Sequence, residues 1–291
     1  MELRVLRYFL AVAREETISG AAEALHVTQP TLSRQLMELE EELGKKLFIR
    51  GKRKTVLTED GLFLRRRAQE IIELADQTET DIRSGEKFVS GDIYIGGGET
   101  DAMRIVARAA KKLQEKHPDI RYHLFSGNAD DVTERLDKGL LDFGVLIEPA
   151  DKKKYDYLKL PAADTWGILM REDSPYASRE FMRPEDLQGL PLLTSRQSMV
   201  QNEMSGWLGQ AFDTLHIVAT YNLLYNASLM VEEGLGYALC LDRIVNTAGS
   251  GLCFRPLSPK MEAGLVMVWK KYRAFSKAAG AFLDTLQTGI L

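Results

Sequence analysis

The chain of 291 residues lacks most of the features that mark membrane, disulfide-rich or metal-binding proteins. Its only cysteines, Cys240 and Cys253, are too isolated for a zinc site. A disulfide between them stays open as an alternative, but buried free thiols are favoured. No apolar run approaches the roughly 20 residues of a membrane-spanning helix. We therefore expect a cytoplasmic protein with no membrane contact, no metal and no cofactor.

The sequence also lacks the short motifs of common catalytic and nucleotide-binding sites. GxxxxGK[ST], HExxH and CxxC do not occur, and "IGGGETD" has Asp101 where GxGxxG needs its third glycine. The four histidines are scattered, at His26, His117, His123 and His216. No nucleophile–base pair can be argued from spacing. An α/β enzyme is therefore an unsupported interpretation, and we predict that the protein is not an enzyme.

An excess of positive charge is missing as well. The formal net charge is −4 and the sequence pI is about 5.7, which argues against a uniformly basic coat for nucleic acid. Residues 45–67, however, hold nine basic and two acidic residues, so this window alone carries +7. A basic face on an acidic protein is typical of DNA contact limited to one domain, although a solvated charged surface is the alternative.

What is present begins with five closely spaced elements. Apolar spacing predicts helices over 3–14 and 17–25, and a third helix capped by Thr28 and ended by Gly44. Two short strands follow at 47–50 and 55–57 around a basic turn. This order is typical of a winged helix-turn-helix.

The third helix has the surface of a helix that reads DNA. On a helical wheel its leucines share one face, and the first two turns present Gln29, Pro30, Ser33 and Arg34 outward. Glutamine can pair with adenine and arginine with guanine in the major groove. Taken alone, the same pattern also fits an ordinary capped surface helix.

A long helix is predicted from Thr58 to about Arg83. Its apolar positions follow a heptad seam, at Leu64, Ala68, Ile71, Ala75, Thr78 and Ile82. Packing on its own domain is possible for such a helix, but dimerisation is favoured. Residues 84–91 are the expected hinge.

From Asp92 the pattern alternates between strands and helices, which predicts a parallel sheet with helices on both faces. We expect three parts: a DNA-binding domain at 1–58, a linker and dimerisation helix with hinge at 59–90, and a two-subdomain α/β domain at 91–291. Its first subdomain takes about 91–161 and 268–291, and its second about 162–267.

The segment "FLAVAREETISGAAEALHVTQPTLSRQLMELEEELGKKLFIR", followed by "LTEDG", closely resembles the DNA-binding domain of LysR-type transcriptional regulators. The match spans about residues 3–61 with the correct spacing. "GDIYIGGGET", "HPDIRYHLFSGN", "LDKGLLDFGVLI" and "MVEEGLGYALC" fit the rest of that family. The resemblance implies an effector domain of the periplasmic-binding-protein type behind the linker helix.

The resemblance implies DNA contact by Gln29, Pro30, Ser33 and Arg34, with Thr28 capping the helix and touching a phosphate. The implied wing contacts are Arg50 and Arg53, and we expect Lys52 and Lys54 to touch phosphate or the minor groove. The tip "GKRK" is more basic than is usual in the family.

The family binds a small effector between its two subdomains, often an organic acid. The corresponding positions here are Gly98, Glu99, Thr100, Ser126, Gly127, Asn128, Ser195, Arg196, Gln197 and Ser198. Glu99 departs from the family, since a carboxylate repels an anion or offsets Arg196. We hypothesise a neutral, cationic or zwitterionic ligand; capping of the following helix by Glu99 is the alternative.

These features predict a sequence-specific, effector-controlled transcriptional regulator. Its expected partners are double-stranded promoter DNA, a small-molecule effector of unknown identity and RNA polymerase. As the resemblance implies, it would act as a homodimer within a homotetramer. The alternative is a solute-binding receptor whose N-terminal helices serve only assembly, and the basic wing argues against it.

Overall fold

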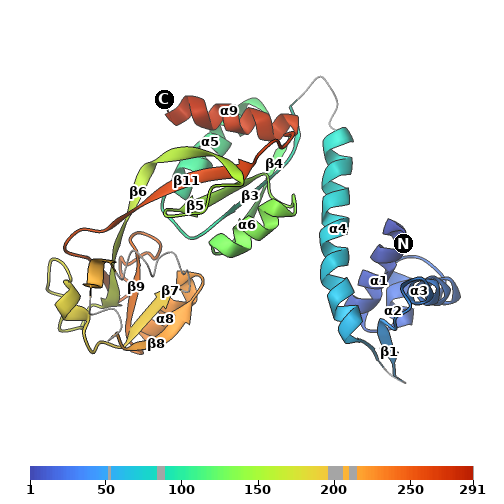
Figure 1. The fold of residues 1–291 in the computed structure, drawn as a ribbon, viewed down its shortest axis with the longest axis horizontal. Coiled ribbons are helices and arrows are strands. Elements are labelled where there is room, and N and C mark those ends of the chain that lie inside the picture. The colour runs from blue at the N-terminus through green and yellow to red at the C-terminus, as the bar shows by residue number, and fades with distance from the viewer. Residues whose placement is uncertain (52–53, 84–88, 196–205, 210–214, 291) are drawn as a thin grey trace. The chain divides into compact units, whose positions relative to one another are not determined.

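The computed structural model describes residues 1–51, 54–83, 89–195, 206–209 and 215–290 (Figure 1). These residues form two compact units, which divide between Arg83 and Ser84. Lys52, Arg53, Arg196, Gln197 and Ser198, all predicted site residues, lie outside the described residues, as does most of the helix expected near 202–212.

The first unit contains the predicted winged helix-turn-helix. Its elements are α1 (Leu3–Glu15), α2 (Ile18–Ala24), α3 (Gln29–Leu43), β1 (Phe48–Arg50), β2 (Thr55–Leu57) and α4 (Glu59–Arg83). The predicted ends of α3 are confirmed: the Thr28 hydroxyl accepts from the Thr31 N–H at 3.4 Å, and Gly44 adopts a φ of 64°. Phe9, Leu32 and Leu36 are fully buried at the centre of this unit.

The start of α4 is tied to the wing. The Thr58 hydroxyl donates to the Lys46 carbonyl at 2.7 Å and accepts from the Gly61 N–H at 3.0 Å. A Cβ on Gly61 would lie 2.2 Å from the carbonyl oxygen of Leu47, so only glycine allows this approach. These contacts explain the local spacing of "LTEDG".

The predicted seam on α4 divides into two parts. Leu64 and Ala68 are 9% and 0% exposed and belong to the core of their own domain. They therefore cannot supply a dimer interface, which corrects that part of the prediction; a heptad spacing does not distinguish a partner helix from α1 of the same unit. Further along, Ile71 and Ile82 are 37% and 78% exposed.

The second unit is a mixed α/β domain, drawn in green to red in Figure 1. Its helices and strands are β3 (Gly91–Gly97), α5 (Met103–Lys116), β4 (Ile120–Ser126), α6 (Ala129–Asp137), β5 (Phe143–Ile147), β6 (Tyr155–Arg171), a 3-10 turn at Pro184–Leu187, β7 (Leu192–Ser195), β8 (Ile217–Tyr221), α8 (Leu224–Glu232), β9 (Tyr237–Leu241), β10 (Leu252–Pro256), β11 (Glu262–Lys270) and α9 (Lys277–Ile290).

The strands order as β4-β3-β5-β11-β6-β9-β7-β8, with β10 beside β6. Strand β3 is parallel to β4 and β5, and β7 is parallel to β8 and β9. The predicted parallel sheet is therefore confirmed for β3, β4 and β5, whereas β6, β10 and β11, which come later in the chain, pair antiparallel.

The antiparallel strands arise because two long strands connect the subdomains. The first half of β6 pairs with β11, and its second half pairs with β9 and β10. Burial is partial over residues 155–161, "YDYLKLP", at the start of β6. The connection through β6 and β11 places the predicted cleft beside the crossing strands.

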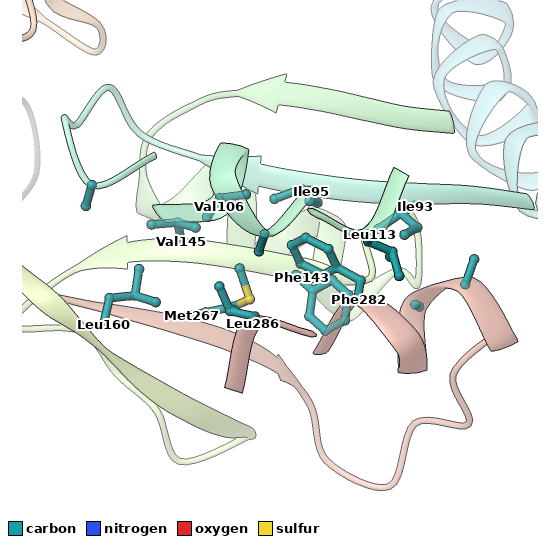
Figure 2. Packing of buried hydrophobic residues seen from close by; sticks show 14 of the residues in the cluster. Ile93, Ile95, Val106, Leu113, Phe143, Val145, Leu160, Met267, Phe282 and Leu286 are labelled. Atoms are coloured by element: carbon teal, nitrogen blue, oxygen red, sulfur yellow. The ribbon is translucent and has the colours of Figure 1, made fainter. Parts of the chain in front are cut away.

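The first subdomain has its own core between the sheet and helices α5 and α9 (Figure 2). Phe143 and Phe282 are fully buried, with ring centroids 5.4 Å apart. Ile93 and Ile95 on β3 and Val106 and Leu113 on α5 pack in the same cluster. This packing holds the carboxyl end of β3, where Gly98, Glu99 and Thr100 follow, in a defined position.

Candidate DNA interface and effector cleft

The predicted DNA-reading residues gather on the first two turns of α3. Thr28, Gln29 and Pro30 are exposed, Ser33 is half-buried, and the Arg34 side chain is 78% exposed. Leu32 and Leu36 on the opposite face are fully buried and hold the helix on its domain. The helix therefore offers a short polar surface at its N-terminal end, as a major-groove helix requires.

The acidic residues in the second half of α3, from Glu38 to Glu42, do not form one surface. Glu38 accepts from Arg34 Nε at 2.8 Å and from Gln35 Nε2 at 2.6 Å. This bond engages the inner nitrogen of the Arg34 guanidinium, and the ion pair raises the pKa of Arg34. Because Nη1 and Nη2 form the outer end of the planar fork, Arg34 keeps the pair of donors suited to guanine.

Glu40 has a structural role that the sequence pattern did not indicate. It is 3% exposed, and its Oε1 accepts from the backbone N–H groups of Leu47 at 2.8 Å and Phe48 at 3.2 Å. Its Oε2 accepts from Lys46 Nζ at 3.0 Å. Burial alone would raise the pKa of Glu40, but the hydrogen bonds from Leu47, Lys46 and Phe48 lower it. Glu40 thereby joins α3 to the wing.

The structure describes the base of the wing but not Lys52 and Arg53 at its tip. The backbone N–H of Thr55 donates to the carbonyl of Glu16 at 2.7 Å, and Lys54 Nζ is ion-paired with the Glu16 carboxylate. This pair lowers the pKa of Glu16. Arg50 ends β1, but its side chain, like Lys52 and Arg53, lies outside what the structure describes. Contact of these basic residues with phosphate stays a prediction.

In the second unit, four predicted effector residues line one pocket: Gly98, Glu99, Asn128 and Ser195. Its volume is about 50 Å³, far below the roughly 300 Å³ of a typical ligand pocket. The Asn128 side chain accepts from the Asp131 N–H at 3.0 Å and caps α6. The pocket formed by these predicted residues is therefore smaller in this structure than a typical ligand pocket.

A neighbouring pocket of about 410 Å³ shares Gly98 and Glu99 and adds Thr100 and Ser126. Charged groups border it, since Asp101 lies 2.6 Å from Arg104 Nε and 3.9 Å from Arg243 Nη1. Arg243 comes from the second subdomain. The predicted effector residues that the structure describes thus line two adjoining pockets of the same cleft.

Glu99 caps a helix, but not the helix that follows it. Helix α5 begins after Ala102, which offers no side-chain cap. Glu99 Oε2 instead accepts from the backbone N–H of Leu224, the first residue of α8 in the second subdomain. The alternative in which Glu99 caps the following helix is therefore wrong, because the carboxylate reaches across the cleft.

Thr100 is buried and turned toward the crossing strand. Its hydroxyl donates to Asp164 on β6 and accepts from the Ala102 N–H at 3.1 Å. Asp164 is 6% exposed, and burial raises its pKa, helped by the negative charge of Asp101 and opposed by the Thr100 hydrogen bond. The Thr100 hydroxyl is thus already hydrogen-bonded to a buried carboxyl group beside the cleft.

The raised pKa of Asp164 leads to a prediction. The folded pKa of Asp164 exceeds its ordinary value of 3.8. The protein therefore loses stability as pH rises from 3.8 through the folded pKa, because the buried carboxyl group must ionise. Asp164→Asn removes that penalty and keeps an acceptor for Thr100. We expect its thermal midpoint at pH 7 to exceed that of the wild type by about 2 °C. The difference should shrink toward pH 4; a constant difference across pH 4–8 would contradict the assignment.

Several cleft residues were missed from the sequence. Trp166, Tyr221, Leu224 and Cys240 line the 50 Å³ pocket together with the predicted residues. Burial strongly raises the pKa of Tyr221 and Cys240, so both side chains are neutral. Their apolar surroundings look like ordinary core in the sequence. Only the approach of the two subdomains turns them into pocket walls.

Within the described ranges, no group of three or more His, Cys, Asp or Glu side chains is arranged to hold a metal ion. Among the same residues, no helix is both long and apolar enough to cross a membrane.

Comparison with known proteins covers both units. The family model "Bacterial regulatory helix-turn-helix protein, lysR family" matches residues 3–62, and "LysR substrate binding domain" matches residues 87–290. The Hca operon transcriptional activator HcaR of Escherichia coli is 28% identical over 93% of this chain and 92% of its own length. The uncharacterised transcriptional regulator YvbU of Bacillus subtilis is 25% identical over 98% and 97%.

Solved structures share the fold along the full chain. The crystal structure of CbnR, a LysR family transcriptional regulator, has a TM-score of 0.79 at 18% identity and covers 100% of both chains. CbnR in complex with its target DNA gives a TM-score of 0.77. With family models over both units, the chain belongs to the LysR family of DNA-binding transcriptional regulators, which carry an effector-binding domain behind the helix-turn-helix.

Proposed function

We propose that this regulator reads its operator with the first two turns of α3, with Gln29 and Arg34 at base edges and Thr28, Pro30 and Ser33 on the flanking backbone. The observation that carries the proposal is the exposed polar start of α3, held rigidly by the buried leucines and by Glu40. Arg50, Lys52, Arg53 and Lys54 would add phosphate contacts through the wing. The protein acts in the cytoplasm, without catalysis and without a cofactor.

The apolar half of α4 supports a homodimer, itself part of a homotetramer. A groove of about 660 Å³ runs beside this half and is lined by Leu3, Arg7, Ile71, Leu74, Ala75, Thr78, Glu79 and Ile82. Ile71, Leu74 and Ile82 are 37%, 42% and 78% exposed. A row of exposed apolar side chains on one helix face favours a second copy of the same helix. The predicted Ile71, Ala75, Thr78 and Ile82 remain in this face.

Replacing Ile71 by Ser should raise the dissociation constant of the dimer about tenfold, because a buried isoleucine contact is lost. Sedimentation of the full-length protein over a concentration series measures this change. Leu62→Ser is the matched control, since Leu62 is a 56% exposed leucine on α4 outside the seam. Equal weakening by both variants would assign the interface to another face of the helix.

The effector would bind between the two subdomains, change the angle between them and so reposition the paired DNA-binding domains. RNA polymerase is a further partner of the DNA-bound form. The convergence of Gly98, Glu99, Asn128 and Ser195 on one pocket supports the location of the ligand.

A salt-dependent gel shift on the DNA upstream of the protein's own gene tests the proposal. We expect a discrete complex whose affinity falls steeply with salt, as counterion release requires. The rival interpretation, a solute-binding receptor with N-terminal helices for assembly only, predicts no complex on any native promoter fragment, with or without cell extract.

A further inference from the structure

Helix α8 begins without a cap of its own. Its N-cap residue, Leu223, has no side-chain acceptor, and the helix then continues for nine residues. The first N–H of the helix, on Leu224, is satisfied by the carboxylate of Glu99 from the opposite subdomain. A free helix N-terminus is a site that favours an anion. In this protein the anionic group at the start of α8 is the carboxylate of Glu99, a residue of the same chain.

A second residue that lines the same pocket carries a buried donor without a partner among the described residues. Trp166 is 4% exposed and lines the pocket with Glu99 and Leu224. Its indole Nε1–H finds no acceptor among the residues that the structure describes. A buried donor without an acceptor costs free energy. The pocket therefore has one anionic group already in place, and one of its lining residues carries a buried donor without an acceptor among the described residues.

Resting on the proposed role of the cleft, we propose that Glu99 determines ligand specificity: its carboxylate takes the place of a ligand carboxylate at the start of α8. The site then favours a neutral or cationic small molecule. A ligand carboxylate would have to displace Glu99 or lie beside it, and two like charges at short range repel. The Glu99 bond also joins the two subdomains, so a ligand that engages Glu99 changes the cleft directly.

Chemical rescue of the full-length protein tests this assignment. Glu99→Ala deletes a CH2–COO⁻ group, for which acetate is the matching probe. We expect the variant to melt about 2–4 °C below the wild type through loss of the cap. Acetate at about 50 mM should then raise its midpoint by about 2 °C more than equal sodium chloride does, and leave the wild type unchanged. Glu115→Ala, an exposed glutamate on α5, is the control in which acetate should have no effect.

Acetamidinium has the shape of acetate but carries one positive charge. We expect acetamidinium to stabilise the wild type more than acetate does, and Glu99→Ala to reverse that order. Glu99→Gln, which keeps the acceptor and removes the charge, gives the same comparison if the alanine variant fails to fold; it should lose the preference for acetamidinium. Acetate stabilising the wild type as much as the Glu99 variants would overturn the proposal.

The outcome is separable from the proposed function. These midpoints need no DNA, so a protein that binds promoter DNA but shows no rescue overturns the specificity proposal alone. A protein that shows rescue but binds no promoter fragment overturns the proposed function alone.

Discussion

Glu40→Ala is expected to lower the free energy of unfolding of the DNA-binding domain by about 3 kcal/mol, because two buried backbone N–H groups lose their acceptor at about 1–3 kcal/mol each. The groups are those of Leu47 and Phe48, at the entrance to the wing. Hydrogen exchange on the full-length protein reports the effect locally, since these two amides should lose protection. Chemical denaturation gives the free energy.

The neighbouring residue supplies the control. Glu41 is exposed on the same helix, so Glu41→Ala should change stability by no more than about 0.5 kcal/mol. If both variants lost the same stability, charge on the helix and not the buried hydrogen bonds would be responsible.

The pH dependence of the same site has a definite sign. The folded pKa of Glu40 lies below its ordinary value of 4.5, so its contribution is present above pH 4.5 and is lost as pH falls through the folded pKa. Glu40→Gln should therefore flatten the acid limb of the stability curve below pH 4.5. An unchanged acid limb would contradict the lowered pKa.

Arg34→Ala is expected to weaken specific DNA binding by about 1–3 kcal/mol, roughly 5- to 150-fold, and to relax the choice of base at one position of the operator. Arg34→Lys should lose nearly as much, because lysine cannot form the bidentate pair with guanine. Fluorescence anisotropy with the bound promoter fragment and a scrambled duplex, each over a salt series, measures both effects.

Arg4→Ala separates base reading from charge. Arg4 is an exposed arginine on α1, ion-paired with Glu2, and its loss removes the same charge from the same domain. We expect Arg4→Ala to weaken both duplexes slightly and alike. If Arg34→Ala also weakened both alike, Arg34 would be a phosphate contact and the assignment of α3 as a base-reading helix would rest on Gln29 alone.

The order of elements and the ends of the helices could be read from the chain, because caps, glycines and apolar spacing act locally. Thr28 and Gly44 bound α3 in the structure as their chemistry predicts, and Thr58 starts α4. The outward position of Gln29 and Arg34 follows from the periodicity of the helix. The family resemblance rests on the same short-range patterns, which is why the DNA-binding half was predicted in most detail.

Contacts between distant segments could not be read in this way. A glutamate in "ELEEELG" can be solvated or buried, and only the fold brings Glu40 to the amides of the wing. The heptad on α4 fitted a partner helix, yet packing against its own domain buries Leu64 and Ala68. Glu99 and Leu224 are 125 residues apart, and their bond exists because β6 and β11 bring the two subdomains together. Local sequence rules determine which side chains point outward from each helix. Long-range packing determines which of these side chains are already hydrogen-bonded or buried by other segments of the same chain.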